Sequence, residues 1–121
     1  MSASAVSEYL LGLGAAAREV APGEWGLSLD DVGGWPLHVG VSLRHGMLRA
    51  QAEAVGPGQV DEHELLFRNR SLRVVRYAHT GAGAVWVLGD LPEDAVTPAE
   101  VDRLLGLLVD AARAVREVAS V

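Results

Sequence analysis

An alternation of apolar and polar residues in the first half of the chain restricts the fold more than any other feature of this sequence. It runs through positions 25–29, 37–43 and 48–54, with small or polar residues between the large apolar ones. A period of two is typical of strands that bury one face and expose the other. Only short stretches, which contain "VGGWP" and "RHG", separate the three segments. We therefore expect an antiparallel meander with one apolar and one polar face.

The segment before this meander contains a glycine spacing that could indicate a nucleotide site. Gly12, Gly14 and Ala17 match the G-x-G-x-x-A pattern of a dinucleotide-binding turn. That turn needs a crossover helix of about a dozen residues after it, and Pro22 interrupts the chain too soon. Apolar residues at helical spacing instead predict one amphipathic helix that ends before Pro22. They are Val6, Tyr9, Leu10, Leu13, Ala17 and Val20.

The second half of the chain predicts a helix, two strands and a long final helix. "VDEHELLFRNRS" is typical of a short helix with acids in its first turn, and "LRVVRYAH" and "AVWVLGDL" are strands joined by "TGAG". Thr97, Pro98 and Glu100 form a capping-box start for a helix that runs to about Ala119. The order α-β-β-β-α-β-β-α predicts an α+β fold with a five-stranded antiparallel sheet, as one domain over 1–121.

Composition limits the classes of function. The chain has 121 residues, is 50% hydrophobic, has no cysteine and carries a formal charge of −6. The lack of cysteine excludes disulfides and thiolate metal sites, and the negative charge argues against non-specific attraction to phosphate backbones. No secretory signal and no membrane span is indicated, so we expect a cytoplasmic protein.

Catalytic patterns are missing from the sequence. The four histidines have no metal-ligand spacing, and there is no G-x-S-x-G nucleophile turn. Adjacent carboxylates at 30–31 and 93–94 lie next to turns and are interpreted as loop residues. We therefore expect no catalytic residue, no cofactor and no metal, and we predict that the protein is not an enzyme.

A run of arginines gives an alternative function. Four of the ten basic residues lie in nine positions, flanked by Phe67 and Tyr77. Basic residues mixed with aromatic ones occur in proteins that bind single-stranded nucleic acid, so a nucleic-acid-associated regulator is the alternative hypothesis. In the simpler interpretation, some arginines offset the dipole of the short helix and the others pair with acids. The candidate basic patch is Arg68, Arg70, Arg73 and Arg76.

The last two expected strands are apolar on both sides. Val85 and Val87 oppose Trp86 and Leu88, and the preceding strand has apolar residues at adjacent positions too. A second apolar face must be covered, either by the short helix or by another chain, because exposed apolar area is unfavourable by roughly 25 cal/mol per Å². We expect a homodimer or partner interface there. Its candidate residues are Leu65, Leu66, Phe67, Val75, Tyr77, Trp86 and Leu88.

The second half also resembles a known family. A short helix ending "LLFRN", a glycine turn, a strand ending in Leu91-Pro92 and then "TPAEVDRLLGLLVDAAR" are similar to the YbjN-like family and to the wider type III secretion chaperone-like fold. The match covers about 65–113, with Asn69, Gly83 and Thr97 as its other marks. The resemblance implies a twisted antiparallel sheet with the first and last helices on one face. It also implies frequent homodimerisation through the short helix and the neighbouring strand, and non-enzymatic binding of other proteins in bacteria.

Overall fold

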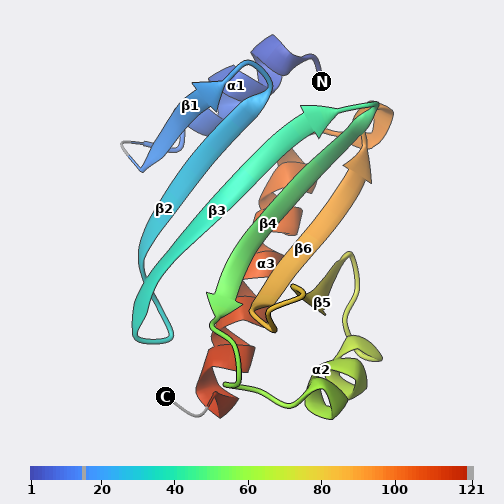
Figure 1. The fold of residues 1–121 in the computed structure, drawn as a ribbon. Coiled ribbons are helices and arrows are strands. Elements are labelled where there is room, and N and C mark those ends of the chain that lie inside the picture. The colour runs from blue at the N-terminus through green and yellow to red at the C-terminus, as the bar shows by residue number, and fades with distance from the viewer. Residues whose placement is uncertain (15, 120–121) are drawn as a thin grey trace.

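The protein is an α+β structure in which one antiparallel sheet carries helices on one side. A computed structural model describes residues 1–14 and 16–119. The six strands lie in the order β1-β2-β3-β4-β6-β5 (Figure 1). The helices are α1 (Ala3–Leu11), α2 (Glu62–Asn69) and α3 (Pro98–Val118), with a 3-10 turn at Glu93–Ala95. The strands are β1 (Ala17–Ala21), β2 (Glu24–Val32), β3 (Trp35–Arg44), β4 (Met47–Val55), β5 (Val75–His79) and β6 (Val85–Pro92).

The predicted meander is confirmed as β2, β3 and β4. Trp25 pairs with Val41 and Val41 with Ala50, so the large apolar residues of the three strands share one face. The turn between β3 and β4 places His45 and Gly46 at φ 52° and 75°, the backbone that tight two-residue hairpins require. One face of the sheet therefore forms the core and the other is free for polar residues.

The prediction for the first 20 residues is wrong in its second half. Helix α1 ends at Leu11, and 17–21 form an edge strand paired with β2, so the sheet has six strands and not five. Gly14, at φ 119°, allows the reversal between helix and strand. The order is helix, turn, strand, whereas a dinucleotide site needs strand, turn, helix. The fold is therefore consistent with our rejection of a nucleotide-binding turn. It contradicts the prediction of one long helix that ends before Pro22.

The last hairpin also differs from the prediction. Strand β5 begins only at Val75, because Val74 adopts φ 70° and the Val75 N–H donates to the carbonyl of Arg73 at 2.7 Å. This γ-turn is strained for a β-branched residue. Tyr77 then pairs with Val87 and lies on the core face. The expectation that Val75 and Tyr77 belong to a second apolar face is therefore wrong.

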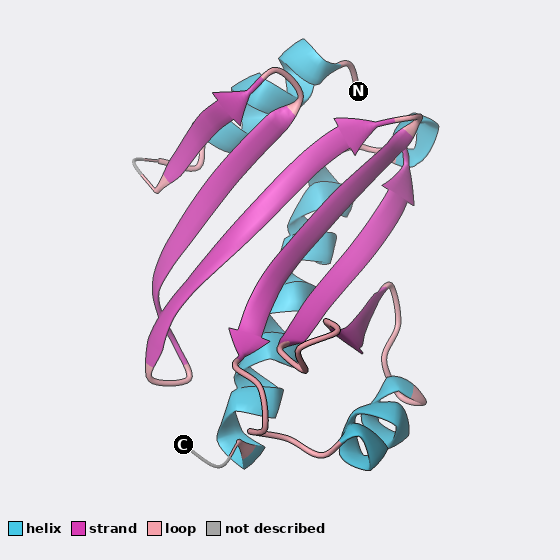
Figure 2. Ribbon diagram, in the orientation of Figure 1, coloured by secondary structure: helices cyan, strands magenta, loops and turns pink. Residues whose placement is uncertain are grey.

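Helices α1 and α3 lie on the same side of the sheet, as the resemblance implies (Figure 2). Val6 and Leu10 of α1 and Leu104 and Leu108 of α3 are fully buried. Tyr9 donates a hydrogen bond to Asp102 and joins the two helices. Burial, together with that carboxylate, raises the pKa of Tyr9 to about 12. No helix in the described residues is long and apolar enough to cross a membrane. The opposite side, here called the open face, has no helix over it in Figure 2.

Candidate protein-binding surfaces

The seven residues predicted to form an interface do not lie on one surface. Leu65, Val75 and Tyr77 are at most 5% exposed within the single chain. Tyr77 donates from its hydroxyl to the carbonyl of Ala111 at 2.6 Å, and its pKa is raised by burial. Helix α3 therefore covers much of what a second chain was expected to cover.

Two of the seven remain strongly exposed on α2. Leu66 and Phe67 are 69% and 67% exposed, the highest values among the large apolar side chains of the described residues. Beside Phe67 a cavity of about 540 Å³ separates α2 from α3, and Leu72 and Leu107 also line it. Leu66, Phe67 and this cavity are called the α2 surface. An exposed aromatic residue next to an apolar hollow is typical of a surface that binds another protein.

Trp86 and Leu88 lie on the open face, whereas the cavity of the α2 surface lies on the helical side of the sheet, beside Val75 and Tyr77. Their neighbours on β4 are Glu53 and Gln51, and on β5 Ala78 and Arg76. Leu88 is buried and Trp86 is half-buried. The open face is thus mostly polar around two apolar side chains, and it does not continue the α2 surface.

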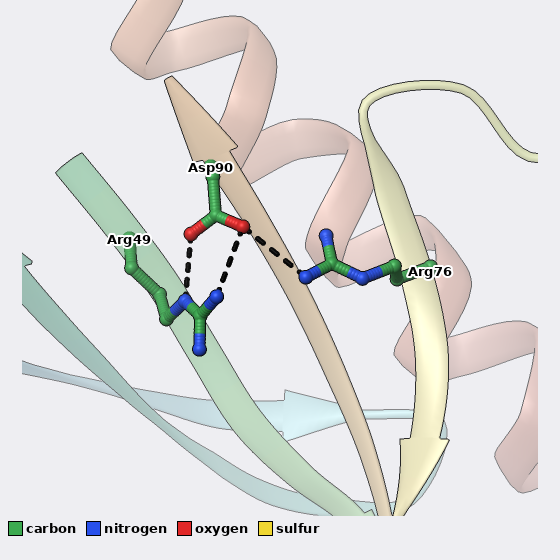
Figure 3. A network of polar contacts seen from close by, with 3 residues as sticks. All are labelled: Arg49, Arg76 and Asp90. Carbon is green, nitrogen blue, oxygen red and sulfur yellow. Dashed lines mark hydrogen bonds and ion pairs between the residues drawn. The ribbon is translucent and has the colours of Figure 1, made fainter. Parts of the chain in front are cut away.

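The structure divides the arginine run. Arg68 pairs with Glu64 on α2 at 2.8 Å, while Arg76 reaches Asp90 on the open face at 3.2 Å. Arg49 also binds Asp90, with its Nε atom 2.6 Å from Oδ1, so two arginines share one carboxylate (Figure 3). The hydrogen bonds from Arg49 hold the pKa of Asp90 below its usual range. Arg68 and Arg76 therefore serve different surfaces and do not form one basic patch.

An apolar groove that the sequence did not predict lies on the helical side of the sheet. Its volume is about 410 Å³, with Asp110 and Arg113 among the residues around it. Gly106, in the middle of α3, has no atom within 4 Å of the position that a Cβ would occupy, so the groove is open there. We call this the α1–α3 groove. Its apolar lining includes Leu13, Ala17, Leu27, Leu29, Leu105 and Val109.

One exposed apolar residue lies at the α1 end of the α1–α3 groove. Leu13, which lines the groove, is 48% exposed and belongs to the segment between α1 and β1. The prediction of a helix through 17–21 did not reveal this surface, because it placed Ala17 in a buried stripe. The signal that could have revealed it is the two glycines at positions 12 and 14, which favour a turn over a helix interior.

The two outer edges of the sheet differ. The side-chain amide of Asn69 accepts from the Tyr77 N–H at 2.8 Å and donates to the Tyr77 carbonyl at 3.0 Å. These bonds occupy the outer edge of β5. Strand β1 pairs only with β2 among the described residues, so its outer backbone groups remain available to another strand.

The described residues contain no candidate metal-binding cluster. No group of three or more His, Cys, Asp or Glu side chains could hold a metal ion there. The resolved pKa shifts belong to Tyr9, Arg49, Tyr77, Asp90 and Arg116, and each follows from burial, an ion pair or a hydrogen bond. The features that indicate an interaction are the apolar α2 surface and the α1–α3 groove.

Comparisons with known proteins find this fold in type III secretion chaperones. No protein-family model and no curated protein sequence matches the chain. The Yersinia pestis type III secretion chaperone SycH, solved with a fragment of YscM2, is 19% identical with a TM-score of 0.69, over 93% of this chain and 98% of that one. The ExsC–ExsE complex matches at 18% identity and a TM-score of 0.73, over 98% and 96%.

A third solved structure has the same fold. The heterodimeric ExoU–SpcU complex of the Pseudomonas aeruginosa type III secretion system is 16% identical with a TM-score of 0.69, over 95% of this chain and 98% of that one. Each similarity covers nearly the whole length of both chains, and each is too low in identity to show more than the fold. The chain has the fold of the type III secretion chaperones.

Proposed function

We propose that this protein is a non-enzymatic, chaperone- or adaptor-like module that acts in the cytoplasm and holds an apolar segment of another protein in the α1–α3 groove. The observation that best supports this proposal is the presence of a glycine, Gly106, inside helix α3. A glycine inside a helix destabilises it by roughly 0.5–1 kcal/mol relative to alanine, and here a Cβ would meet nothing. The sequence thus keeps a less stable helix where a bare backbone widens an apolar groove.

Strand β1 supports the same proposal. Its outer edge adjoins the groove, since Ala17 belongs both to the strand and to the groove lining. An extended segment could pair with this edge through main-chain hydrogen bonds and place alternate side chains in the groove. The structures with this fold include chaperones solved together with other proteins, which favours a protein as the occupant.

We further propose that two copies associate through the α2 surface. Phe67 of one copy would enter the cavity between α2 and α3 of the other, where Leu72 and Leu107 lie. Leu65, Val75 and Tyr77 would support this contact from within, because they are buried behind it. Trp86 and Leu88 take no part in it, since they lie on the open face.

Light scattering on purified protein tests the dimer. We expect a mass of two chains for the natural sequence and of one chain for Phe67→Glu, because a charge in a buried apolar contact is strongly unfavourable. Met47→Glu is the matched control, since Met47 is 40% exposed at the far end of β4. A monomer for the natural protein at all concentrations, or a dimer that Phe67→Glu leaves intact, would refute this interface.

Photocrosslinking in native cells tests the occupant of the groove. A photoreactive phenylalanine analogue at Leu13 should form an adduct with one dominant protein, and the same analogue at Met47 should not. Both positions have comparable exposure, 48% and 40%, so general surface reactivity would label them equally. Equal labelling at the two positions would contradict a specific site in the groove.

The nucleic-acid alternative gains no support from the arrangement of its residues. Arg68 and Arg76 are paired with acids on two different surfaces, and the net charge is −6. We expect no binding of single-stranded DNA or RNA even at low salt, where phosphate contacts are strongest. Binding that weakens in Arg70→Ala and Arg73→Ala, with a reduced salt dependence, would restore the alternative.

A further inference from the structure

Strands β3 and β4 are joined at one end by a side chain from α3. Their last paired residues at that end are Val39 and Ala52. Beyond them the Arg116 guanidinium donates from Nε to the Ala54 carbonyl at 2.8 Å and from Nη2 to the Pro36 carbonyl at 3.0 Å. Arg116 therefore bridges the two strands where the backbone ladder between them has ended.

A cavity opens to solvent beside this bridge. Its volume is about 580 Å³, and Trp35 from β3 and Trp86 from β6 are among its lining residues. Both indoles are half-buried. The volume lies within the range of roughly 300–1,000 Å³ that is usual for binding sites. We call it the tryptophan cavity; it involves the open face, on the side of the sheet opposite the α1–α3 groove.

Two buried polar atoms of this cavity have no partner among the described residues. They are the Trp86 Nε1, which can only donate, and the Gln59 Oε1, which can only accept. Leaving such a group unpaired destabilises a protein by about 1–3 kcal/mol. Trp25 Nε1 is also unpaired, but its side chain is 1% exposed inside the core. The residues that line the tryptophan cavity thus include one buried donor and one buried acceptor that have no partner.

The charges around the cavity favour a neutral occupant. The Arg116 guanidinium lies 4.4 Å from the centre of the Trp35 ring, so one face of that ring already has a cation. A second cation there would be repelled by it. The carboxylate of Glu53, on the rim, would repel an anion. A peptide backbone is neutral and offers both a carbonyl for Trp86 and an N–H for Gln59.

We propose that the tryptophan cavity binds a proline-rich segment of another protein in the polyproline II conformation. Such a segment has no internal hydrogen bonds, so its carbonyls are free, and its proline rings pack on aromatic side chains. Trp35 and Trp86 supply the aromatic surface, Trp86 Nε1 donates to a carbonyl, and Gln59 accepts from a non-proline N–H. The site is independent of the α1–α3 groove and of the proposed dimer.

An NMR titration tests this site with a defined probe. The sequence has three tryptophans, so a ¹⁵N spectrum contains three indole signals, which Trp86→Phe and Trp35→Phe assign. The probe is a synthetic peptide of about a dozen residues with prolines at P-x-x-P spacing and alanines between them; the control peptide replaces every proline by alanine. We expect the proline peptide to shift the Trp86 and Trp35 signals and to leave the Trp25 signal in place.

Two variants make the result specific. Trp86→Phe keeps a ring and removes the donor, and Gln59→Leu removes the acceptor; each should weaken binding by roughly three- to tenfold, the usual effect of one hydrogen bond. The Trp25 signal reports that the core of each variant is intact. Gly106→Leu, in the α1–α3 groove, should leave the affinity for the proline peptide unchanged. The test of this site is therefore independent of the test of the proposed function.

Three results would overturn the proposal. The first is no shift of the Trp86 signal at millimolar peptide. The second is an equal shift with the alanine peptide, which would show general peptide binding without a preference for proline. The third is an affinity that neither Trp86→Phe nor Gln59→Leu changes, which would place the contact elsewhere.

Discussion

The side-chain amide of Asn69 forms two hydrogen bonds with the backbone of Tyr77, one to its N–H and one to its carbonyl. The last residue of α2 therefore takes the place of a neighbouring strand at the outer edge of β5. Exposed edges tend to pair with other chains. Because this edge is occupied and that of β1 is not, the sheet favours strand addition at one end only.

Removing this amide should weaken the packing of α2 against β5. We expect Asn69→Ala to lower the free energy of unfolding by about 1–3 kcal/mol, since two half-buried backbone groups lose their partners. The Tyr77 amide should also exchange its hydrogen faster. Arg70→Ala, one residue later and exposed, is the control and should have an effect within about 0.5 kcal/mol. Unchanged exchange at Tyr77 in Asn69→Ala would show that the amide does not protect the edge.

The Arg116 bridge should be a large contributor to stability. Arg116 is 5% exposed, and its guanidinium also donates from Nη1 to the carbonyls of Val32 and Trp35, at 2.8 and 2.9 Å. We expect Arg116→Met to lower the free energy of unfolding by about 3 kcal/mol, because these carbonyls would be left buried and unpaired. Arg116→Lys should lose less, about 1–2 kcal/mol, since it keeps the charge but cannot span both strands.

Urea denaturation of the three proteins measures these differences. Burial lowers the pKa of Arg116, which shows that desolvation already opposes its charge. If Arg116→Met were as stable as the natural protein, that desolvation would offset the hydrogen bonds in full, and the bridge would have no net stabilising effect.

Asp90 should make stability depend on pH in the acid range. Its pKa is lowered in the folded state by the hydrogen bonds from Arg49, so its stabilising contribution is present at neutral pH and is lost as pH falls through the folded pKa. Asp90→Asn should therefore be less stable than the natural protein at pH 7 by up to about 1 kcal/mol, a small value because both arginines are exposed. The difference should shrink below about pH 4, where unperturbed aspartate titrates. A difference that stays constant from pH 7 to about pH 2 would contradict this linkage.

The sequence predicted helices and strands correctly where all local patterns favoured the same structure. The period of two through β2, β3 and β4 agreed with their short turns, and Thr97 caps α3 as expected, accepting from the Glu100 N–H at 3.2 Å. The short helix α2 begins after Asp61, which accepts from the His63 N–H. In these places periodicity, capping and turn chemistry all favour the same structure.

The failures lie where tertiary packing overrides a local pattern. Ala17 and Val20 fit a helical stripe, but pairing with β2 makes their segment a strand. Val74 favours an extended backbone, yet it occupies a strained turn that moves Val75 and Tyr77 onto the core face. The α1–α3 groove depends on both elements and on Gly106, so no single stretch of sequence could predict it. Arg116 was missed because one arginine on a long helix is usually solvated.

A substitution of Gly106 tests whether this glycine is needed for the fold or only keeps the groove open. Gly106→Ala should raise the free energy of unfolding by about 0.5–1 kcal/mol, because alanine is the better helix former and its Cβ meets no atom. Thermal or urea denaturation measures the gain. A loss of stability would show that the glycine is needed for the fold and would remove it as support for a binding role.

The most direct test of the central claim compares partner capture by Gly106→Leu and Arg103→Leu. Both add a leucine at an exposed position of α3, the first in the lining of the α1–α3 groove and the second one helical turn away, outside that lining. The protein that crosslinks at Leu13 should be lost from Gly106→Leu, which fills the groove, and retained in full by Arg103→Leu. Equal capture by the two variants would show that the groove is not where this protein holds its partner.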